Sequence, residues 1–195
     1  MDYSTVKVGF LPPEKIKKDA DRIRKQNRIS DVPVNVELLL EKLGIFIEAK
    51  SLLFQRTGAE ALITSSWDMV LVDFEKYMDD NYINRLRFSL AHEFGHMILH
   101  RDLFESFQIK DEKTYRDFFS NIPEVQYKKI ETQANMFANN FLVPNDVLAV
   151  RKREVISELK LSSFANSTLH PYLANFLCNE FGVSVDVMEI ALKYN

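Results

Sequence analysis

The sequence predicts an α+β fold with a mostly helical core, a small, largely antiparallel three-stranded sheet and a C-terminal helical tail. Apolar residues recur with helical spacing over residues 82–100 and 128–143, which predicts two long core helices. Between residues 45 and 74, three short runs rich in Ile, Val and Leu are separated by turn residues, as is typical of strands. Gly182 and Ser184 interrupt the apolar pattern near the C-terminus, so we expect the tail to form two short helices.

The composition indicates an ordered globular chain of 195 residues with a net charge of −3, five Gly and six Pro. We expect residues 1–145 to form the core and residues 146–195 to form a helical extension packed on it. A lone cysteine, Cys178, excludes an internal disulfide bond and is typical of a reducing cytoplasm, where we expect the protein to reside. No apolar run in the sequence approaches the roughly 20 residues needed to cross a bilayer, so no membrane partner is expected.

Two helices are predicted near the N-terminus. The first covers residues 13–27 and begins at a pair of prolines. Three apolar residues form a narrow stripe along it: Ile16, Ala20 and Ile23. The second helix covers residues 36–43, with Asn35 as its N-cap and Gly44 at its end.

Three strands are predicted at residues 45–50, 61–65 and 69–74, with a turn at residues 55–58 between the first two. A short polar connection at residues 66–68 joins the last two strands, which favours a hairpin. A small, largely antiparallel sheet is therefore expected just before the first of the two long core helices.

Residues 92–96 read His-Glu-Phe-Gly-His within that first core helix. Because residues four apart share one face of a helix, His92 and His96 point the same way and form half of a zinc site. Glu93 lies beside them, where its carboxylate can take a proton from a zinc-bound water. Gly95 costs about 1 kcal/mol relative to Ala inside a helix, which indicates that another helix approaches closely there. The alternative is a pair of hydrogen-bonded core histidines with an exposed Glu.

A catalytic zinc site uses three protein ligands and a water, so a third ligand is required. His100 lies one turn further along the same helix, and three ligands on one straight helix would spread over about 12 Å. We therefore expect His100 to cap the helix or to form a hydrogen bond nearby. Glu131 is the better candidate, because Ala134 and Ala138 on its helix are small enough for close approach; the alternative is a solvated charge. Asn135 can accept a hydrogen bond from the far nitrogen of a ligand histidine.

Two segments of the sequence resemble the ImmA/IrrE family of metallo-endopeptidases. Residues 87–100 read R-F-S-L-A-H-E-F-G-H-M-I-L-H, similar to the family pattern R-F-[ST]-L-A-H-E-x-G-H. Residues 131–144 read E-T-Q-A-N-M-F-A-N-N-F-L-V-P, similar to E-x-x-A-[ND]-x-F-A-x-x-L-L-x-P. Shorter similarities occur at residues 32–45 and 181–184. Together these segments extend over most of the chain after residue 30.

The resemblance implies a zincin-like core in which His92, His96 and Glu131 bind Zn²⁺ and Glu93 acts as general base. It implies a zinc-dependent endopeptidase that hydrolyses peptide bonds with the help of water. It further implies a protein substrate, namely a helix-turn-helix transcriptional repressor cut at a specific site, in mobile-element control or stress response.

The residues leave an alternative function open. The predicted tail helices, residues 171–180 and 185–194, can resemble a helix-turn-helix, so a non-catalytic, zinc-stabilised regulatory module that binds DNA or a toxin–antitoxin partner is the second hypothesis. The acidic chain and the absence of a basic second helix from the sequence argue against direct nucleic-acid binding. For the peptidase, Tyr115 and Tyr127 are both candidates for an oxyanion donor. The connection at residues 101–126 is expected to contain short helices that cover or edge the cleft.

Overall fold

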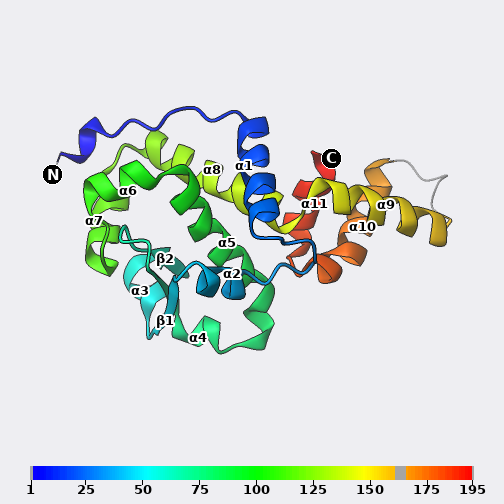
Figure 1. The fold of residues 1–195 in the computed structure, drawn as a ribbon, viewed down its shortest axis with the longest axis horizontal. Coiled ribbons are helices and arrows are strands. Elements are labelled where there is room, and N and C mark those ends of the chain that lie inside the picture. Colours follow the sequence, from blue (N-terminus) through cyan, green and yellow to red (C-terminus); the bar gives the residue numbers. More distant parts are fainter. Residues whose placement is uncertain (1, 161–165, 195) are drawn as a thin grey trace.

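A computed structural model describes residues 2–160 and 166–194 of the chain. The predicted α+β class is confirmed, because a three-stranded sheet accompanies a mostly helical body (Figure 1). In chain order the elements are η1 (Tyr3–Thr5), α1 (Pro13–Gln26), α2 (Val36–Lys42), β1 (Phe46–Lys50), α3 (Leu53–Thr57), β2 (Ala61–Ile63), β3 (Met69–Asp73), α4 (Phe74–Tyr77), η2 (Asp80–Tyr82), α5 (Ile83–Leu99), α6 (Arg101–Phe107), α7 (Glu112–Asn121), α8 (Glu124–Leu142), α9 (Asn145–Glu158), α10 (Asn166–Phe181) and α11 (Val185–Lys193).

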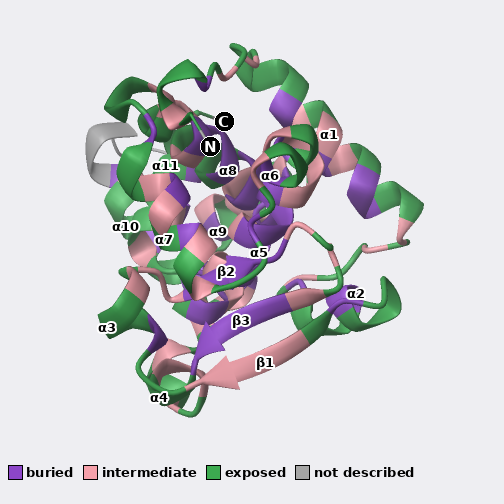
Figure 2. Cartoon of the chain, turned by 90° about the vertical axis from the view of Figure 1, so that its left-hand side faces the viewer, coloured by how far each residue is buried: buried purple, intermediate pink, exposed green. Residues whose placement is uncertain are grey.

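Helices α5 and α8 pack against each other at the centre of the molecule. Figure 1 shows the sheet with α2, α3 and α4 below this pair and the C-terminal helices to its right. Figure 2 shows that β3, the middle strand, is buried, whereas β1 is only partly buried. No helix within the described residues is long and apolar enough to cross a membrane.

The two N-terminal helices form as predicted. The apolar stripe of α1 faces the core, where Ile16 and Ala20 are fully buried. The side chain of Asn35 caps α2 by accepting a hydrogen bond of 2.9 Å from the backbone N–H of Leu38. Gly44 follows α2 with φ +75°, a backbone conformation that L side chains rarely adopt.

The sheet has the strand order β1-β3-β2 and is mixed rather than largely antiparallel. β2 and β3 form the expected antiparallel hairpin, but β1 runs parallel to β3, with Phe46 opposite Met69. The predicted turn at residues 55–58 is instead the end of the short helix α3, which stops at Gly58. Because α3 lies between β1 and β2 in the chain, β2 does not pair with β1 but pairs with β3 on its other side. β1 therefore pairs with β3 alone, and the two strands are parallel.

Gly95 lies at a close approach between α5 and α8. A Cβ atom at this position would lie 3.1 Å from Cδ1 of Phe137 and 3.3 Å from the backbone oxygen of Ala134, both on α8. The prediction that another helix approaches closely at Gly95 is therefore confirmed.

The connection after α5 contains two short helices, α6 and α7, as expected. Phe104 of α6 and Phe118 of α7 are fully buried, and their ring centroids lie 6.1 Å apart. α8 begins at Glu124, one turn earlier than the predicted start at Lys128, because Pro123 immediately precedes it and presets the backbone for a helix.

The tail forms two helices, but the first does not begin at Pro171. α10 starts at Asn166 and carries the proline inside it. Proline removes one backbone hydrogen bond from a helix. The apolar spacing nevertheless continues across it, with Leu169, Leu173 and Leu177 all buried, so packing offsets that loss. The second tail helix, α11, begins after Ser184, whose hydroxyl accepts a hydrogen bond from the backbone N–H of Val187.

Candidate metal centre

Three side chains from the two central helices converge on one point. His92 and His96 lie one turn apart on α5, and Glu131 comes from α8. The Nε2 atoms of the two histidines are 2.9 Å apart. The Glu131 carboxylate lies 3.4 Å from Nε2 of His92 and 3.6 Å from Nε2 of His96. The structure therefore brings together, within 4.8 Å of one another, ligand atoms of the three residues selected from the sequence.

The Glu131 carboxylate is only partly satisfied by the protein. Its Oε1 atom is buried, yet it has no hydrogen-bond partner within the described residues. An unpaired buried carboxylate oxygen is costly, and a cation between it and the two imidazoles would satisfy it. Imidazole nitrogens and carboxylate oxygens are ligands of Zn²⁺, and three protein ligands leave a fourth position open. The residues present therefore fit a divalent cation with one coordination position left open.

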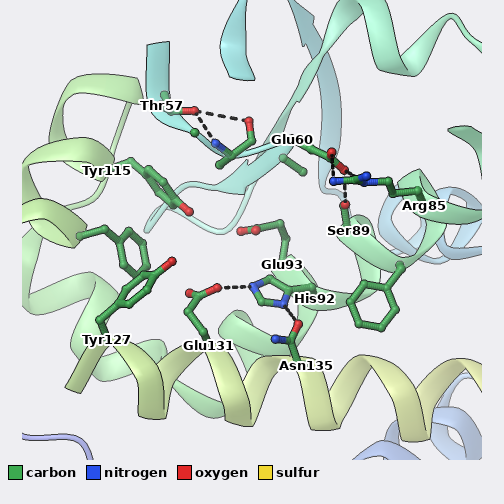
Figure 3. A pocket seen from close by; sticks show the side chains of 15 residues that line it. Thr57, Glu60, Arg85, Ser89, His92, Glu93, Tyr115, Tyr127, Glu131 and Asn135 are labelled. Atoms are coloured by element: carbon green, nitrogen blue, oxygen red, sulfur yellow. Dashed lines mark hydrogen bonds and ion pairs between the residues drawn. The ribbon is translucent and has the colours of Figure 1, made fainter. Parts of the chain in front are cut away.

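Each of the two histidines has another partner on its second ring nitrogen. Nδ1 of His92 lies 2.9 Å from Oδ1 of Asn135, which is one turn after Glu131 on α8 (Figure 3). Because Oδ1 can only accept, His92 carries a hydrogen on Nδ1 and presents Nε2 to the centre. Nδ1 of His96 lies 3.1 Å from Nδ1 of His100, which is itself outside the converging group.

The surroundings of the two histidines give them different charge states. Burial, together with the neighbouring His92 and His100, lowers the pKa of His96 well below its usual value, so this ring is neutral. Burial also opposes a charge on His92. The hydrogen bond to Glu131 and the charges of Glu93 and Glu131 outweigh that effect and raise the pKa of His92. A cation at the centre would replace the proton that Glu131 attracts to His92.

Glu93 lies next to the centre and is almost fully buried. Its Oε2 atom accepts a hydrogen bond of 2.8 Å from the backbone N–H of Ile63, at the end of β2. In Figure 3 its carboxylate points into the space between Tyr115 and Glu131. Burial raises the pKa of Glu93 to about 8, against the opposing influence of His92. A carboxyl group that can hold or release a proton near neutral pH therefore faces the centre.

An open cavity of ≈ 390 Å³ gives access to these residues. Its lining comprises Thr57, Gly58, Ala59, Glu60, Ala61, Arg85, Phe88, Ser89, His92, Glu93, Tyr115, Phe119, Tyr127, Glu131 and Asn135. α7 contributes Tyr115 and Phe119, so the connection at residues 101–126 forms part of the cavity wall.

Both tyrosines that the sequence nominated point their phenol groups into the cavity (Figure 3). Burial and the charges of Glu93 and Glu131 raise the pKa of Tyr115 well above its usual value. Burial and the charge of Glu131 also raise the pKa of Tyr127. Both phenols therefore stay protonated and can donate a hydrogen bond to a negatively charged oxygen.

Two contacts of the site were not anticipated from the sequence. One is the hydrogen bond from Ile63 to Glu93, and the other is the hydrogen bond between His100 and Gln133 of α8, whose Nε2 and Oε1 atoms are 2.9 Å apart. Both join segments that are 30 or more positions apart in the chain. No local spacing rule indicates such partners, although a buried helix that carries a third histidine indicates that this histidine needs one.

Two helices thus present two imidazoles and a carboxylate beside a buried acid, an arrangement that could hold a metal ion. The model of the IrrE N-terminal-like domain, a peptidase family designated M78, matches residues 83–193, which is more than half of the chain. The chain belongs to this family, and the family resemblance of the sequence is thereby confirmed. The match covers α5 to α11, and residues 32–45 lie outside it. A comparison with curated proteins finds no match.

Proposed function

We propose that the protein is a zinc-dependent endopeptidase that hydrolyses peptide bonds with Glu93 as general base. One observation carries the proposal: the Glu131 carboxylate faces the Nε2 atoms of His92 and His96, and its buried Oε1 has no hydrogen-bond partner among the described residues. The carboxyl group of Glu93 lines the same open cavity as Glu131 and His92. Such a centre can bind a cation and can also place a water molecule next to the Glu93 carboxyl group.

In this proposal His92, His96 and Glu131 hold Zn²⁺. When bound, the ion supplies a Lewis acid that polarises the scissile carbonyl and lowers the pKa of a water molecule. The positive charge also stabilises the ionised form of Glu93, so the group is a base when the reaction begins.

Glu93 moves the proton. Its Oε2 atom is held by the backbone N–H of Ile63, which fixes the side chain and leaves Oε1 for the reacting molecules. Oε1 takes a proton from the attacking water and then delivers it to the nitrogen of the leaving amine. Burial favours the protonated carboxyl group between these two steps, because it penalises the charged form.

A phenol donates to the oxygen that becomes negative in the transition state. Tyr115 comes from α7 and Tyr127 from the first turn of α8, and both side chains line the cavity. Tyr115 is nearly buried, whereas Tyr127 is 40% exposed. A hydrogen bond from a buried donor is the stronger one, because water does not compete for it, so we assign the larger share of this role to Tyr115.

The substrate in this proposal is a protein, namely a helix-turn-helix transcriptional repressor that is cut at one or a few sites, and the reaction takes place in the cytoplasm. Family resemblance supports the substrate, and the single cysteine of the sequence supports the compartment. Regulation of transcription, as in the control of mobile elements, would follow from removal of the repressor.

The test compares the wild type with Glu93→Gln, which keeps size and polarity but removes the base. Both proteins are loaded with zinc, checked for one ion per chain and incubated with candidate helix-turn-helix repressors, chosen first from the genes beside that of this protein. Mass spectrometry of the fragments is the readout. We expect the wild type to cut at one or a few positions and the variant to bind zinc without cutting. If neither protein cuts the repressor under otherwise activating conditions, the peptidase hypothesis is rejected in favour of the non-catalytic binding module.

A further inference from the structure

A chain of hydrogen bonds leads from His96 to the N-terminal segment. Nδ1 of His96 lies 3.1 Å from Nδ1 of His100. Nε2 of His100 lies 2.9 Å from Oε1 of Gln133 on α8, and Nε2 of Gln133 donates a hydrogen bond of 2.8 Å to the backbone oxygen of Gly9. The chain therefore joins three segments: the end of α5, the middle of α8 and the extended stretch before α1.

The direction of every bond in this chain follows from its last member. The backbone oxygen of Gly9 can only accept, so the Gln133 amide turns its NH₂ group toward it and its oxygen toward His100. The hydrogen between His100 and Gln133 then belongs to Nε2 of His100. In a neutral ring the other nitrogen, Nδ1 of His100, has a lone pair and accepts.

The consequence for His96 is specific. Because Nδ1 of His100 accepts, Nδ1 of His96 carries the hydrogen of the bond between them. A neutral imidazole has a single hydrogen on nitrogen, so Nε2 of His96 is left with a lone pair. Nε2 is the atom that faces His92 and Glu131 at the centre. The opposite form, with the hydrogen on Nε2, would be unable to bind a metal ion through that atom.

We infer that His100 and Gln133 are positioning residues that hold His96 in its metal-binding tautomer, and that the backbone oxygen of Gly9 sets the direction of the chain. The inference rests on the proposed role of His96 as a zinc ligand. It adds the N-terminal segment, which lies outside the family match at residues 83–193, to the parts of the protein that determine metal affinity.

Burial makes the arrangement effective. His96 is 0% exposed, His100 5% and Gln133 6%, so water does not replace any of the three partners. The rest of the His96 ring packs against aromatic side chains, with the Phe104 ring centroid at 5.1 Å and that of Phe119 at 6.3 Å. Since His100 is the partner of Nδ1, loss of its acceptor would leave that N–H of His96 buried and unpaired.

The structure offers a matched control for the N-terminal segment. The backbone N–H of Val8 donates a hydrogen bond of 2.8 Å to Oε1 of Gln126, two turns before Gln133 on α8. Gln126 and Gln133 thus hold the same stretch of chain through one side-chain bond each. Only Gln133 also contacts a histidine, so Gln126→Met reports the effect of loosening the segment alone.

The test has two readouts. The first is the tautomer of His96 and His100 in the metal-free wild type, read from long-range ¹H–¹⁵N correlations. We expect the hydrogen on Nδ1 of His96 and on Nε2 of His100. The second is zinc affinity, measured by competition with a chromophoric chelator. We expect Gln133→Met and His100→Phe to weaken zinc binding roughly 10–100-fold, the range typical of lost outer partners of a ligand histidine.

Two further variants separate positioning from packing. His100→Asn keeps an acceptor oxygen at the position of Nδ1, because Oδ1 of Asn and Nδ1 of His are attached at the same place on the side chain. We expect it to bind zinc more tightly than His100→Phe, because Nδ1–H of His96 keeps an acceptor, although the contact with Gln133 is lost. Gln126→Met should also bind zinc like the wild type.

Failure of the inference differs from failure of the proposed function. If the wild type binds no zinc but shows the expected tautomers, the proposed metal site is wrong and the hydrogen-bond chain still stands. A wild type that binds zinc and carries the hydrogen on Nε2 of metal-free His96 overturns the inference. Folded Gln133→Met and His100→Phe variants with unchanged zinc affinity would overturn it as well. If these variants do not fold, the inference is tested by the tautomers of the wild type and by the zinc affinity of His100→Asn.

Discussion

Replacement of Gly95 by Ala tests how tightly α5 and α8 are packed at the metal centre. In a solvent-exposed helix, Gly→Ala stabilises by about 1 kcal/mol. Here the new Cβ atom would lie 3.1 Å from Cδ1 of Phe137, 3.3 Å from its Cβ and 3.3 Å from the backbone oxygen of Ala134. Carbon atoms prefer a separation of roughly 3.5–4.0 Å, so the two carbon contacts are too short, and the contact with oxygen is also tighter than most Cβ contacts in proteins. The backbone oxygen can yield only if α8 itself moves.

Overpacking of this kind costs about 1–3 kcal/mol, so at the middle of that range, about 2 kcal/mol, it exceeds the gain of about 1 kcal/mol in helix propensity. We therefore expect Gly95→Ala to lower the free energy of unfolding by about 1 kcal/mol, obtained as the difference between the two effects. We also expect weaker zinc binding, because Ala134 is three residues from Glu131 and a shift of α8 there displaces the carboxylate.

The assay is urea unfolding of the metal-free and zinc-saturated proteins, together with chelator competition for zinc. Thr132→Ala is the matched control, since Thr132 is exposed on α8 and its replacement should give only a propensity gain of up to about 0.7 kcal/mol. If Gly95→Ala is more stable than the wild type by about 1 kcal/mol, the reasoning from close packing is refuted.

Three further substitutions test the centre itself. Glu131→Ala should bind less than one zinc per chain by metal analysis, because it removes the only carboxylate in the converging group; undiminished zinc would move the third ligand elsewhere. Asn135→Leu should weaken zinc binding roughly 10–100-fold in chelator competition, because Nδ1–H of His92 loses its acceptor. Tyr115→Phe should lower kcat roughly 10²–10³-fold at unchanged zinc content if its phenol is the oxyanion donor. Tyr127→Phe should then have a smaller effect, and the reverse order in steady-state peptide assays would exchange the two roles.

The helical part of the site could be predicted from the sequence because helix spacing is a local property. His92 and His96 share a face of α5 whatever the rest of the chain does. Gly95 and Ala134 indicated a close pair of helices, and in the structure the backbone oxygen of Ala134 lies 3.3 Å from where a Cβ atom of residue 95 would be. Glu131 followed from the need for a third ligand on the facing helix.

The direction of β1 could not be predicted in the same way. Alternating apolar residues identify a strand but do not determine which neighbour it pairs with or in which direction it runs. The pairing depends on α3, whose sequence looked like a turn because Gly58 ends it after a few residues. The hydrogen-bond partners of Glu93 and His100 could not be predicted from the sequence either. Ile63 and Gln133 are distant in the chain and come close to them only in the tertiary fold.

Charge balance connects the packing of α5 and α8 to the proposed chemistry. The seam between the two helices brings the carboxyl groups of Glu93 and Glu131 to one cavity, close to the neutral ring of His96, and burial raises the pKa of Glu93 to about 8. A divalent cation would favour the ionised form of both carboxyl groups and would satisfy Oε1 of Glu131, which has no hydrogen-bond partner among the described residues. The hydrogen bond from the backbone N–H of Ile63 holds Glu93 independently of the three candidate ligands. A cation bound by those ligands would therefore leave Glu93 free to act as the proposed base.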